Sequence, residues 1–179
     1  MEGNPHYKII TYLLSDLENS GHGILDAGSG KTSLNILTNY FTKSVIDAVV
    51  FPGDLKKIDF IKETVTNENY VLKEIDLINT EIDKKYYLVL SHLLLGESKR
   101  FDHLFIDMLS ELMYIKSTYF IIIDFLENPD IDFEYIEEFL SNNLLTIEKE
   151  VSVSLSTPQE FSDFEGKTLK GYLIKKSDE

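Results

Sequence analysis

Residues 23–33 read Gly-Ile-Leu-Asp-Ala-Gly-Ser-Gly-Lys-Thr-Ser: an apolar strand, then Asp26, Gly28 and Gly30, then a helical pattern. In an open parallel sheet, ligands bind at the carboxyl ends of strands where the strand order reverses. Glycines let the backbone approach a ligand closely, and the amides at the start of the next helix favour an anionic group. The segment therefore predicts a loop that can hold a carboxylate or a phosphate. A tight strand-to-helix turn also needs glycine for geometry alone, and that alternative stays open.

Short apolar runs and amphipathic helical patterns alternate along the chain after this loop. Runs rich in Val, Ile, Tyr and Phe predict strands, and apolar residues at three- and four-residue spacing predict helices. The expected strands are Ile24–Ala27, Val45–Phe51, Tyr70–Ile75, Tyr86–Ser91 and Tyr119–Phe125. The expected helices are Thr32–Phe41, Leu55–Val65, Phe101–Tyr114 and Phe133–Leu140. This alternation is typical of a parallel sheet covered by helices on both faces.

The two ends of the chain depart from this alternation. Asn4 and Pro5 are typical of a helix N-cap and first turn, and apolar residues then recur at helical spacing until Gly21 and Gly23. Residues 144–155 and 168–176 are strand-like, without a helical pattern between them. They predict an antiparallel pair at the sheet edge, joined by Ser156 to Lys167.

Together these patterns predict a single α/β domain over residues 1–179, with a three-layer architecture and a mostly parallel sheet of about seven strands. Its parts are a leading helix over residues 1–22, a strand–helix core over 23–141 and antiparallel strands over 142–179. A chain of 179 residues, 43% of them hydrophobic, can form one core that buries roughly 70% of the unfolded surface.

Charge and composition exclude several classes of function. Seventeen Lys and Arg against 31 Asp and Glu give a formal net charge of −14, which disfavours nucleic acid and membrane surfaces as partners. The absence of cysteine excludes disulfides and thiolate chemistry, and the four histidines lack the spacing of a metal site. The start of the chain lacks the features of a signal peptide, and no apolar run approaches the ~20 residues of a membrane span. We therefore expect a cytoplasmic protein without a bound metal.

The end of the glycine segment, Gly30-Lys31-Thr32, also invites comparison with a phosphate-binding P-loop. That motif needs another glycine five residues before the Gly of its Gly-Lys-Ser/Thr end, and this position is Leu25, inside the strand. The loop would be too short to wrap a phosphate. A P-loop nucleotide hydrolase is therefore the weaker alternative, with Lys31 an exposed residue of the first helical turn.

Ile24-Leu-Asp-Ala-Gly-Ser-Gly30 resembles the first motif of class I S-adenosylmethionine-dependent methyltransferases, an apolar strand followed by Asp-x-Gly-x-Gly. The predicted order of elements is also similar to that family, from Gly23 to Lys176. The resemblance implies a Rossmann-like fold, S-adenosyl-L-methionine as cofactor and methyl transfer to an acceptor. It further implies that Asp26, Gly28 and Gly30 surround the methionine part of the cofactor, with backbone contacts from Ala27 and Ser29.

The adenosine part of the predicted site both matches and departs from that family. An acid at the end of the second strand usually holds the ribose, but here Val50 or Phe51 takes its place. Asp54 is either the ribose ligand or an ordinary N-cap of the next helix. Phe51 either offers its ring to the adenine or packs in the core. Asp76 is expected to accept the adenine amino group beside the N–H of Leu77, or else serves only as a turn residue.

The fourth strand ends at Ser91 and His92, beside the place that the resemblance implies for the sulfonium. Methyl transfer from a sulfonium is an in-line displacement, so positioning supplies most of the acceleration and a base is optional. His92 is the best-placed base and Glu97 the weaker candidate, whereas a lone histidine there is alternatively a hydrogen-bonded structural residue. His6 and Tyr7 of the leading helix either lie over the pocket or cap the core.

The acceptor is constrained only by what the chain lacks. The Asp/Asn-Pro-Pro-aromatic sequence that marks family members acting on base amines or glutamine amides is absent. So short a chain implies either a small-molecule acceptor or a partner protein, such as the second copy of a homodimer, that completes the pocket. A non-catalytic S-adenosylmethionine-binding or interaction module is the alternative function. The acidic residues Asp124, Glu127, Asp130 and Asp132 are expected to form a solvated loop rather than a cation site.

Overall fold

The computed structural model describes residues 3–155 and 167–176, and within them seven strands form one sheet in the order β3-β2-β1-β4-β5-β7-β6. The strands are β1 (Ile24–Asp26), β2 (Ile46–Val50), β3 (Tyr70–Glu74), β4 (Tyr86–His92), β5 (Ser117–Phe125), β6 (Thr146–Ser154) and β7 (Thr168–Lys175). The helices are α1 (Pro5–Leu14), α2 (Lys31–Tyr40), α3 (Leu55–Thr64), the 3-10 helix η1 (Leu95–Phe101), α4 (Phe105–Tyr114) and α5 (Phe133–Asn142). Strands β1 to β5 are parallel, whereas β7 pairs antiparallel with both β5 and β6. The predicted mostly parallel α/β sheet with an antiparallel C-terminal pair is thus confirmed.

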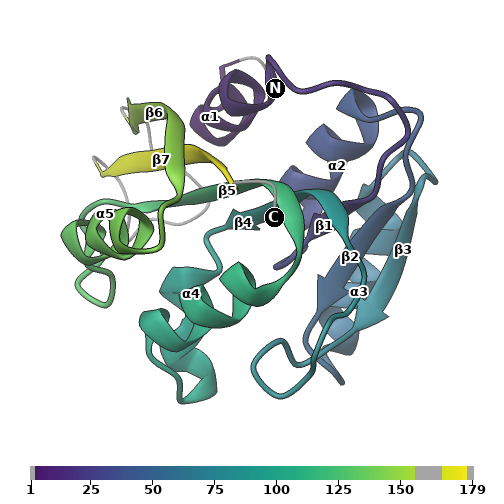
Figure 1. Ribbon diagram of the computed structural model, residues 1–179. Helices are drawn as coiled ribbons and strands as arrows, with labels where there is room; N and C mark the ends of the chain where they lie inside the picture. Colours follow the sequence, from purple (N-terminus) through teal and green to yellow (C-terminus); the bar gives the residue numbers. More distant parts are fainter. Residues whose placement is uncertain (1–2, 156–166, 177–179) are drawn as a thin grey trace.

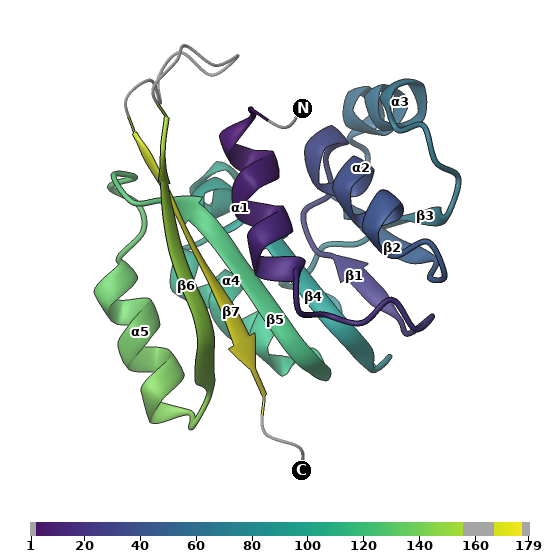
Figure 2. The same ribbon diagram turned by 90° about the horizontal axis from the view of Figure 1, so that it is seen from above.

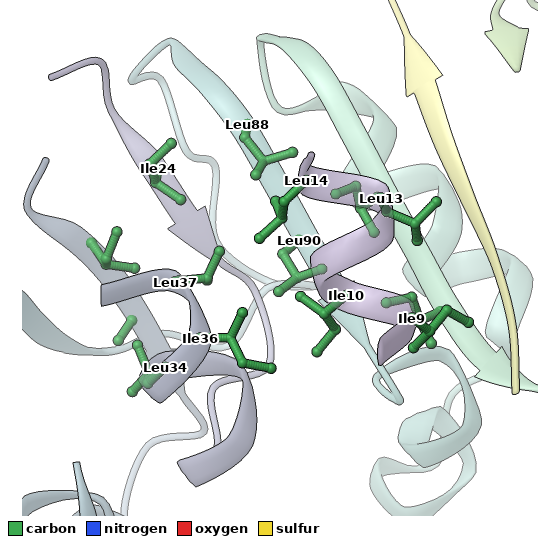
Figure 3. Packing of buried hydrophobic residues seen from close by; sticks show 14 of the residues in the cluster. Ile9, Ile10, Leu13, Leu14, Ile24, Leu34, Ile36, Leu37, Leu88 and Leu90 are labelled. Atoms are coloured by element: carbon green, nitrogen blue, oxygen red, sulfur yellow. The ribbon is translucent and has the colours of Figure 1, made fainter. Parts of the chain in front are cut away.

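Helices cover both faces of the sheet (Figure 1). Viewed from above, α1, α2 and α3 lie on one face, and α4 and α5 lie on the other (Figure 2). Each layer has its own apolar cluster. On the first face Ile10 and Leu14 of α1 and Leu37 of α2 pack against Leu88 and Leu90 of β4 (Figure 3). On the second face, Leu109 of α4 and Ile136 of α5 belong to the other apolar cluster.

The leading helix begins where the sequence predicts and ends earlier. The side chain of Asn4 accepts the His6 N–H at 2.8 Å, and Pro5 occupies the first turn. The helix was expected to continue to Gly21 but ends at Leu14. The Ser15 hydroxyl donates to the carbonyl of Tyr12 at 2.8 Å, a local side-chain bond that competes with helix continuation.

The expected helix Phe101–Tyr114 is two elements. Phe101 is the last residue of η1, and α4 begins only at Phe105. Between them Asp102 adopts a left-handed backbone with φ of 60°, which Asp tolerates better than most residues. A new helix start follows, where the Asp107 carboxylate accepts the N–H of Leu104 at 3.3 Å.

The C-terminal pair is also shorter than expected. Leu144 was expected in a strand, but it lies in the turn after α5, with a left-handed φ of 57° and an 82% exposed side chain. Most of the connection expected over residues 156–167 lies outside the described residues. Strand β7 lies between β5 and β6 in the sheet, and α1 packs directly on it. A Cβ added to Gly171 would lie 2.9 Å from the Leu13 Cδ1 atom and 3.1 Å from atoms of Ile9 and Ile123.

The strand order reverses beside β1. Strand β2 pairs with one side of β1 and β4 with the other, and the crossovers run to opposite directions of the sheet. In such sheets the crevice at this reversal is the usual ligand site. The fold therefore places the loop after β1, which starts at Ala27, at the centre of the carboxyl edge. Among the described residues, no helix combines the length and apolar character needed to cross a membrane.

Candidate functional site

A depression lies at the carboxyl ends of β1, β2 and β3. Its volume is about 550 Å³ when the space open to solvent is included. The cavity volume that a water molecule can reach is only about 50 Å³. Seven residues singled out by the sequence analysis line it, namely Ala27, Gly28, Phe51, Asp54, Asp76, Leu77 and Glu97. Residues to which the sequence analysis gave no cofactor contact also line it, among them Lys57, Leu94, Arg100, Phe101 and His103. Segments far apart in the sequence thus converge on one place.

Asp26 supports the glycine loop from below rather than lining the depression. Its side chain is fully buried, and its Oδ2 atom accepts the Ser33 hydroxyl at 2.6 Å. The Ser29 hydroxyl donates to the carbonyl of Asp26 at 3.0 Å, and the Gly30 N–H donates to Ser33 Oγ at 3.2 Å. The Asp26 Oδ1 atom has no hydrogen-bond partner within the described part of the chain. Burial raises the pKa of this carboxyl to about 6.

This orphaned oxygen bears on whether S-adenosylmethionine fits the loop. A buried acceptor without a donor costs free energy that a ligand can recover, and the amino group of the cofactor is such a donor. Gly28 brings bare backbone to the wall of the depression. The residues around the loop therefore fit the chemistry of the cofactor.

The two predicted acids of the adenosine half already have local partners. Asp54 Oδ1 accepts the Lys57 N–H at 3.2 Å, as an N-cap of α3 does. Asp76 accepts the Ile78 N–H at 3.2 Å and the side-chain amide of Asn79 at 2.7 Å, as a turn residue does. Both acids nevertheless line the depression, and a carboxylate has about four lone-pair sites. Their cofactor contacts remain predictions.

Phe51 lies at the rim of the depression and is 40% exposed, so the alternative that it packs in the core is wrong. Its ring stacks on Phe101, with centroids 4.5 Å apart and an interplanar angle of 22°. No sequence signal identified Phe101, because the pattern assigned it to the following helix. An aromatic ring therefore lies where adenine is expected. In this structure the ring of Phe101 stacks on it.

His92, the last residue of β4, pairs with His6 of α1. His92 Nε2 lies 2.9 Å from His6 Nδ1, and the rings meet edge to face with centroids 5.1 Å apart. One ring must donate its N–H and the other must accept it. Burial lowers the pKa of both residues, that of His92 to about 3, so both are neutral at pH 7. This bond agrees with the alternative that His92 is a hydrogen-bonded structural residue. A catalytic role for His92 stays a prediction.

Two further residues were expected near the reacting groups, Ser91 for the cofactor and Glu97 as the weaker candidate base. Ser91 is fully buried, and its hydroxyl has no partner among the described residues. Glu97 is exposed and lines the depression. The contact of Ser91 with the cofactor and the contact of Glu97 with a substrate proton stay predictions.

Asp124 does not belong to a solvated loop, which corrects the expectation for this residue. It is the penultimate residue of β5 and is 1% exposed. Its carboxylate accepts the Gly96 N–H at 2.9 Å and its neighbour Phe125 N–H at 2.8 Å, and burial raises its pKa to about 7. The three acids that follow, Glu127, Asp130 and Asp132, are exposed as expected. No group of three potential metal ligands occurs in the described ranges.

Lys31, on which the P-loop alternative depends, is the first residue of α2. Its side chain is exposed and does not line the depression. The structure thus offers no phosphate contact for Lys31 in this depression.

Neither a family model nor a curated protein sequence matches this chain. Solved structures do. A Pyrococcus horikoshii protein assigned as an RNA methyltransferase is 16% identical, with a TM-score of 0.65 over 96% of this chain and 82% of its own. A Listeria monocytogenes protein assigned as an S-adenosylmethionine-dependent methyltransferase is 14% identical, with a TM-score of 0.64 over 97% of this chain and 99% of its own.

Coclaurine N-methyltransferase, solved with N-methylheliamine and SAH, is 13% identical, with a TM-score of 0.59 over 95% of this chain and 72% of its own. At identities of 13 to 16%, these similarities concern the fold of the chain. The chain has the fold of the class I S-adenosylmethionine-dependent methyltransferases.

Proposed function

We propose that this protein binds S-adenosyl-L-methionine and transfers its methyl group to an acceptor that remains to be identified. The observation that carries the proposal is the convergence of Gly28, Phe51 and Asp76 on one depression at the strand reversal. The resemblance of the glycine loop implied these residues separately, from the ends of the first three strands. That solved methyltransferases share the fold supports the same reading.

Each part of the depression has a role in this proposal. Gly28 allows the main chain to approach the methionine part, while Asp26 below the loop offers its orphaned oxygen to the amino group. Phe51 offers a ring face to the adenine, and Asp76 accepts from its amino group. No acid stands at the end of β2 to hold the ribose, so we assign that role to Asp54 and the Lys57 ammonium, which both line the depression.

The cofactor supplies an electrophilic methyl group on its sulfonium. The protein then needs to hold the acceptor in line and exclude water, because alignment supplies most of the acceleration in such a displacement. A histidine whose pKa is about 3 is a weak base at pH 7. We therefore assign His92 to orientation of the acceptor through its neutral ring, with Glu97 at the mouth as the weaker candidate for taking up a proton.

The alternative function is a non-catalytic module that binds the cofactor or a protein partner. Two observations favour it. Val50 and Phe51 stand where an acid for the ribose is expected, and His92 is hydrogen bonded to His6. Methyl transfer to an identified acceptor would distinguish the methyltransferase from the non-catalytic module. For the methyltransferase we propose a small acceptor, or a partner subunit that completes the site.

Calorimetric titration with S-adenosylhomocysteine tests the cofactor, and tritiated methyl transfer to panels of small molecules and proteins tests turnover. We expect binding and a higher melting temperature, because a ligand of the native state stabilises it by mass action. Lys31→Ala is the matched control, and it should bind S-adenosylhomocysteine as well as the wild type does. Binding without turnover would favour the module. No heat at millimolar ligand, or ATP binding that Lys31→Ala removes, would refute the proposal.

A further inference from the structure

Two side chains of the protein stand where the proposed function puts the cofactor. A Cβ added to Gly28 would lie 3.0 to 3.3 Å from three carbon atoms of Leu94, so Leu94 covers the exposed backbone of this glycine. The Phe101 ring covers Phe51 at 4.5 Å. The cavity volume that remains in the depression is about 50 Å³. That holds a few water molecules, whereas small-molecule pockets usually measure about 300 Å³ or more.

Both obstructing residues belong to one short segment. Leu94 directly precedes η1 and Phe101 is its last residue. Displacement of residues 93–102 would therefore clear Gly28 and Phe51 in a single movement. The rest of the depression, formed by the ends of β1 to β3, need not change.

The segment has unusual backbone at both of its ends. Leu93 has a φ of 62° and Asp102 a φ of 60°, and the third described non-glycine residue with positive φ, Leu144, lies far along the chain. A left-handed conformation is strained for a leucine such as Leu93 and less strained for an aspartate such as Asp102. The docked segment thus stores strain at the two points where a hinge would have to turn.

The middle of the segment is held by a few contacts. Asp124 Oδ2 accepts the Gly96 N–H at 2.9 Å, and Leu95 is 1% exposed. The fit is imperfect, because Ser98 is buried while its hydroxyl has no partner among the described residues. Docking is therefore favoured by the buried Leu95, by the hydrogen bond from Gly96 to Asp124 and by an exposed ion pair between Lys99 and Asp130 at 3.3 Å. It is opposed by strain and an unsatisfied hydroxyl.

We propose that residues 93–102 form a lid on the cofactor site, which must swing about Leu93 and Asp102 before the cofactor can bind. In the docked position Leu94 takes the place of the methionine part on Gly28, and Phe101 takes the place of adenine on Phe51. This inference rests on the proposed function, since it assumes that the depression receives S-adenosylmethionine. Its consequence is that apparent cofactor affinity equals the intrinsic affinity multiplied by the open fraction.

Variants that shift the lid in opposite directions test this proposal by calorimetric titration with S-adenosylhomocysteine. Leu94→Ala removes the Cγ and Cδ1 atoms that cover Gly28 and keeps only the Cβ, so it should tighten binding by about five-fold or more. Asp102→Gly removes strain from the docked position, because glycine adopts positive φ freely, and should weaken binding by about three-fold. Leu144→Gly is the control, because it relieves the same strain outside the segment and should leave affinity unchanged.

A second measurement reports the movement itself. The Leu94 methyl groups and the Gly28 α protons should show a nuclear Overhauser contact in the protein alone and lose it at saturating S-adenosylhomocysteine. Leu94 is buried, so folding of Leu94→Ala is checked by circular dichroism. Should that variant not fold, Phe101→Ala replaces it in the test. It uncovers Phe51 at the rim of the depression and should also bind S-adenosylhomocysteine more tightly.

The outcomes separate the lid from the proposed function. If Leu94→Ala and Phe101→Ala bind more weakly than the wild type, these residues are fixed walls of the site and the lid is refuted. Equal affinity in all variants, or persistence of the Leu94–Gly28 contact with ligand, refutes the lid and leaves the cofactor assignment standing. Binding by neither the wild type nor any folded variant refutes the cofactor assignment and the lid with it.

Discussion

The Nε2 atom of His92, at the end of β4, lies 2.9 Å from the Nδ1 atom of His6, in the first turn of α1. The His6 ring also meets the ring of Phe125 edge to face, with centroids 6.1 Å apart. The contact joins the leading helix to the carboxyl edge of the sheet across 86 residues of sequence. A neutral pair of imidazoles therefore fixes the start of α1 against the end of β4.

We predict that this pair makes the fold sensitive to acid. Burial lowers the pKa of His92 to about 3, whereas an unfolded histidine titrates near ~6.5. Between these values the unfolded chain binds more protons, so the stability from a neutral His92 is complete above pH ~6.5 and is lost as the pH falls toward 3. His92→Asn should flatten the decline of unfolding free energy between pH 6.5 and 4.5 in urea titrations. Parallel declines in the two proteins would contradict the prediction.

Asp124 should act in the opposite direction. Burial raises its pKa to about 7, so the folded chain binds more protons than the unfolded chain between pH ~4 and 7. Its contribution to stability is complete below pH ~4 and is lost as the pH rises through 7. Asp124→Asn does not titrate, and its stability relative to the wild type should improve from pH 5 to pH 8. Urea titrations at the two pH values measure this, and a constant difference would show that Asp124 stays ionised throughout.

Asp76 should read the adenine amino group. Asp76→Ala is expected to weaken S-adenosylhomocysteine binding by roughly 1–3 kcal/mol, the usual cost of an unmet buried hydrogen-bonding partner. The matched ligand is S-inosylhomocysteine, which lacks the amino group and should bind the wild type and the variant alike in calorimetry. A variant that still prefers the adenine ligand as strongly as the wild type would show that Asp76 only shapes its turn.

Gly171 should be indispensable for the packing of α1 on β7. Its added Cβ would lie 2.9 Å from Leu13 Cδ1, closer than side chains approach one another. Gly171→Ala should therefore lower the free energy of unfolding by about 1–3 kcal/mol through overpacking. Gly3→Ala is the control, because nothing lies within 4 Å of its added Cβ. A Gly171→Ala protein as stable as that control would mean that α1 shifts without cost.

The sheet was predictable from the sequence because its signals are local. Buried runs such as Phe120–Ile123 read as strands on composition alone, and Asn4 with Pro5 marked the start of α1 correctly. The glycine loop was likewise identified by residue types at fixed spacing. Seven of the twelve site residues then met at one depression because parallel strands bring their carboxyl ends to the same edge.

The covering segment was not predictable, because tertiary contacts determine it. Leu93 adopts a left-handed conformation that its residue type disfavours, and Gly96 is held by Asp124 from 28 residues away. Neither fact leaves a pattern in neighbouring residues. The same holds for His6 and His92, whose pairing depends on how α1 crosses the sheet.

Strand β6 ends the sheet, and its outer edge has consequences for how the protein behaves at high concentration (Figure 2). Unpaired edge strands recruit other chains, which leads to aggregation. Here the register shifts between Ile147 and Lys149, and the exposed positions around the shift carry Glu148 and Glu150. A bulge and a pair of like charges both oppose the docking of a further strand. These features thus oppose the growth of fibrils from the β6 edge of the sheet.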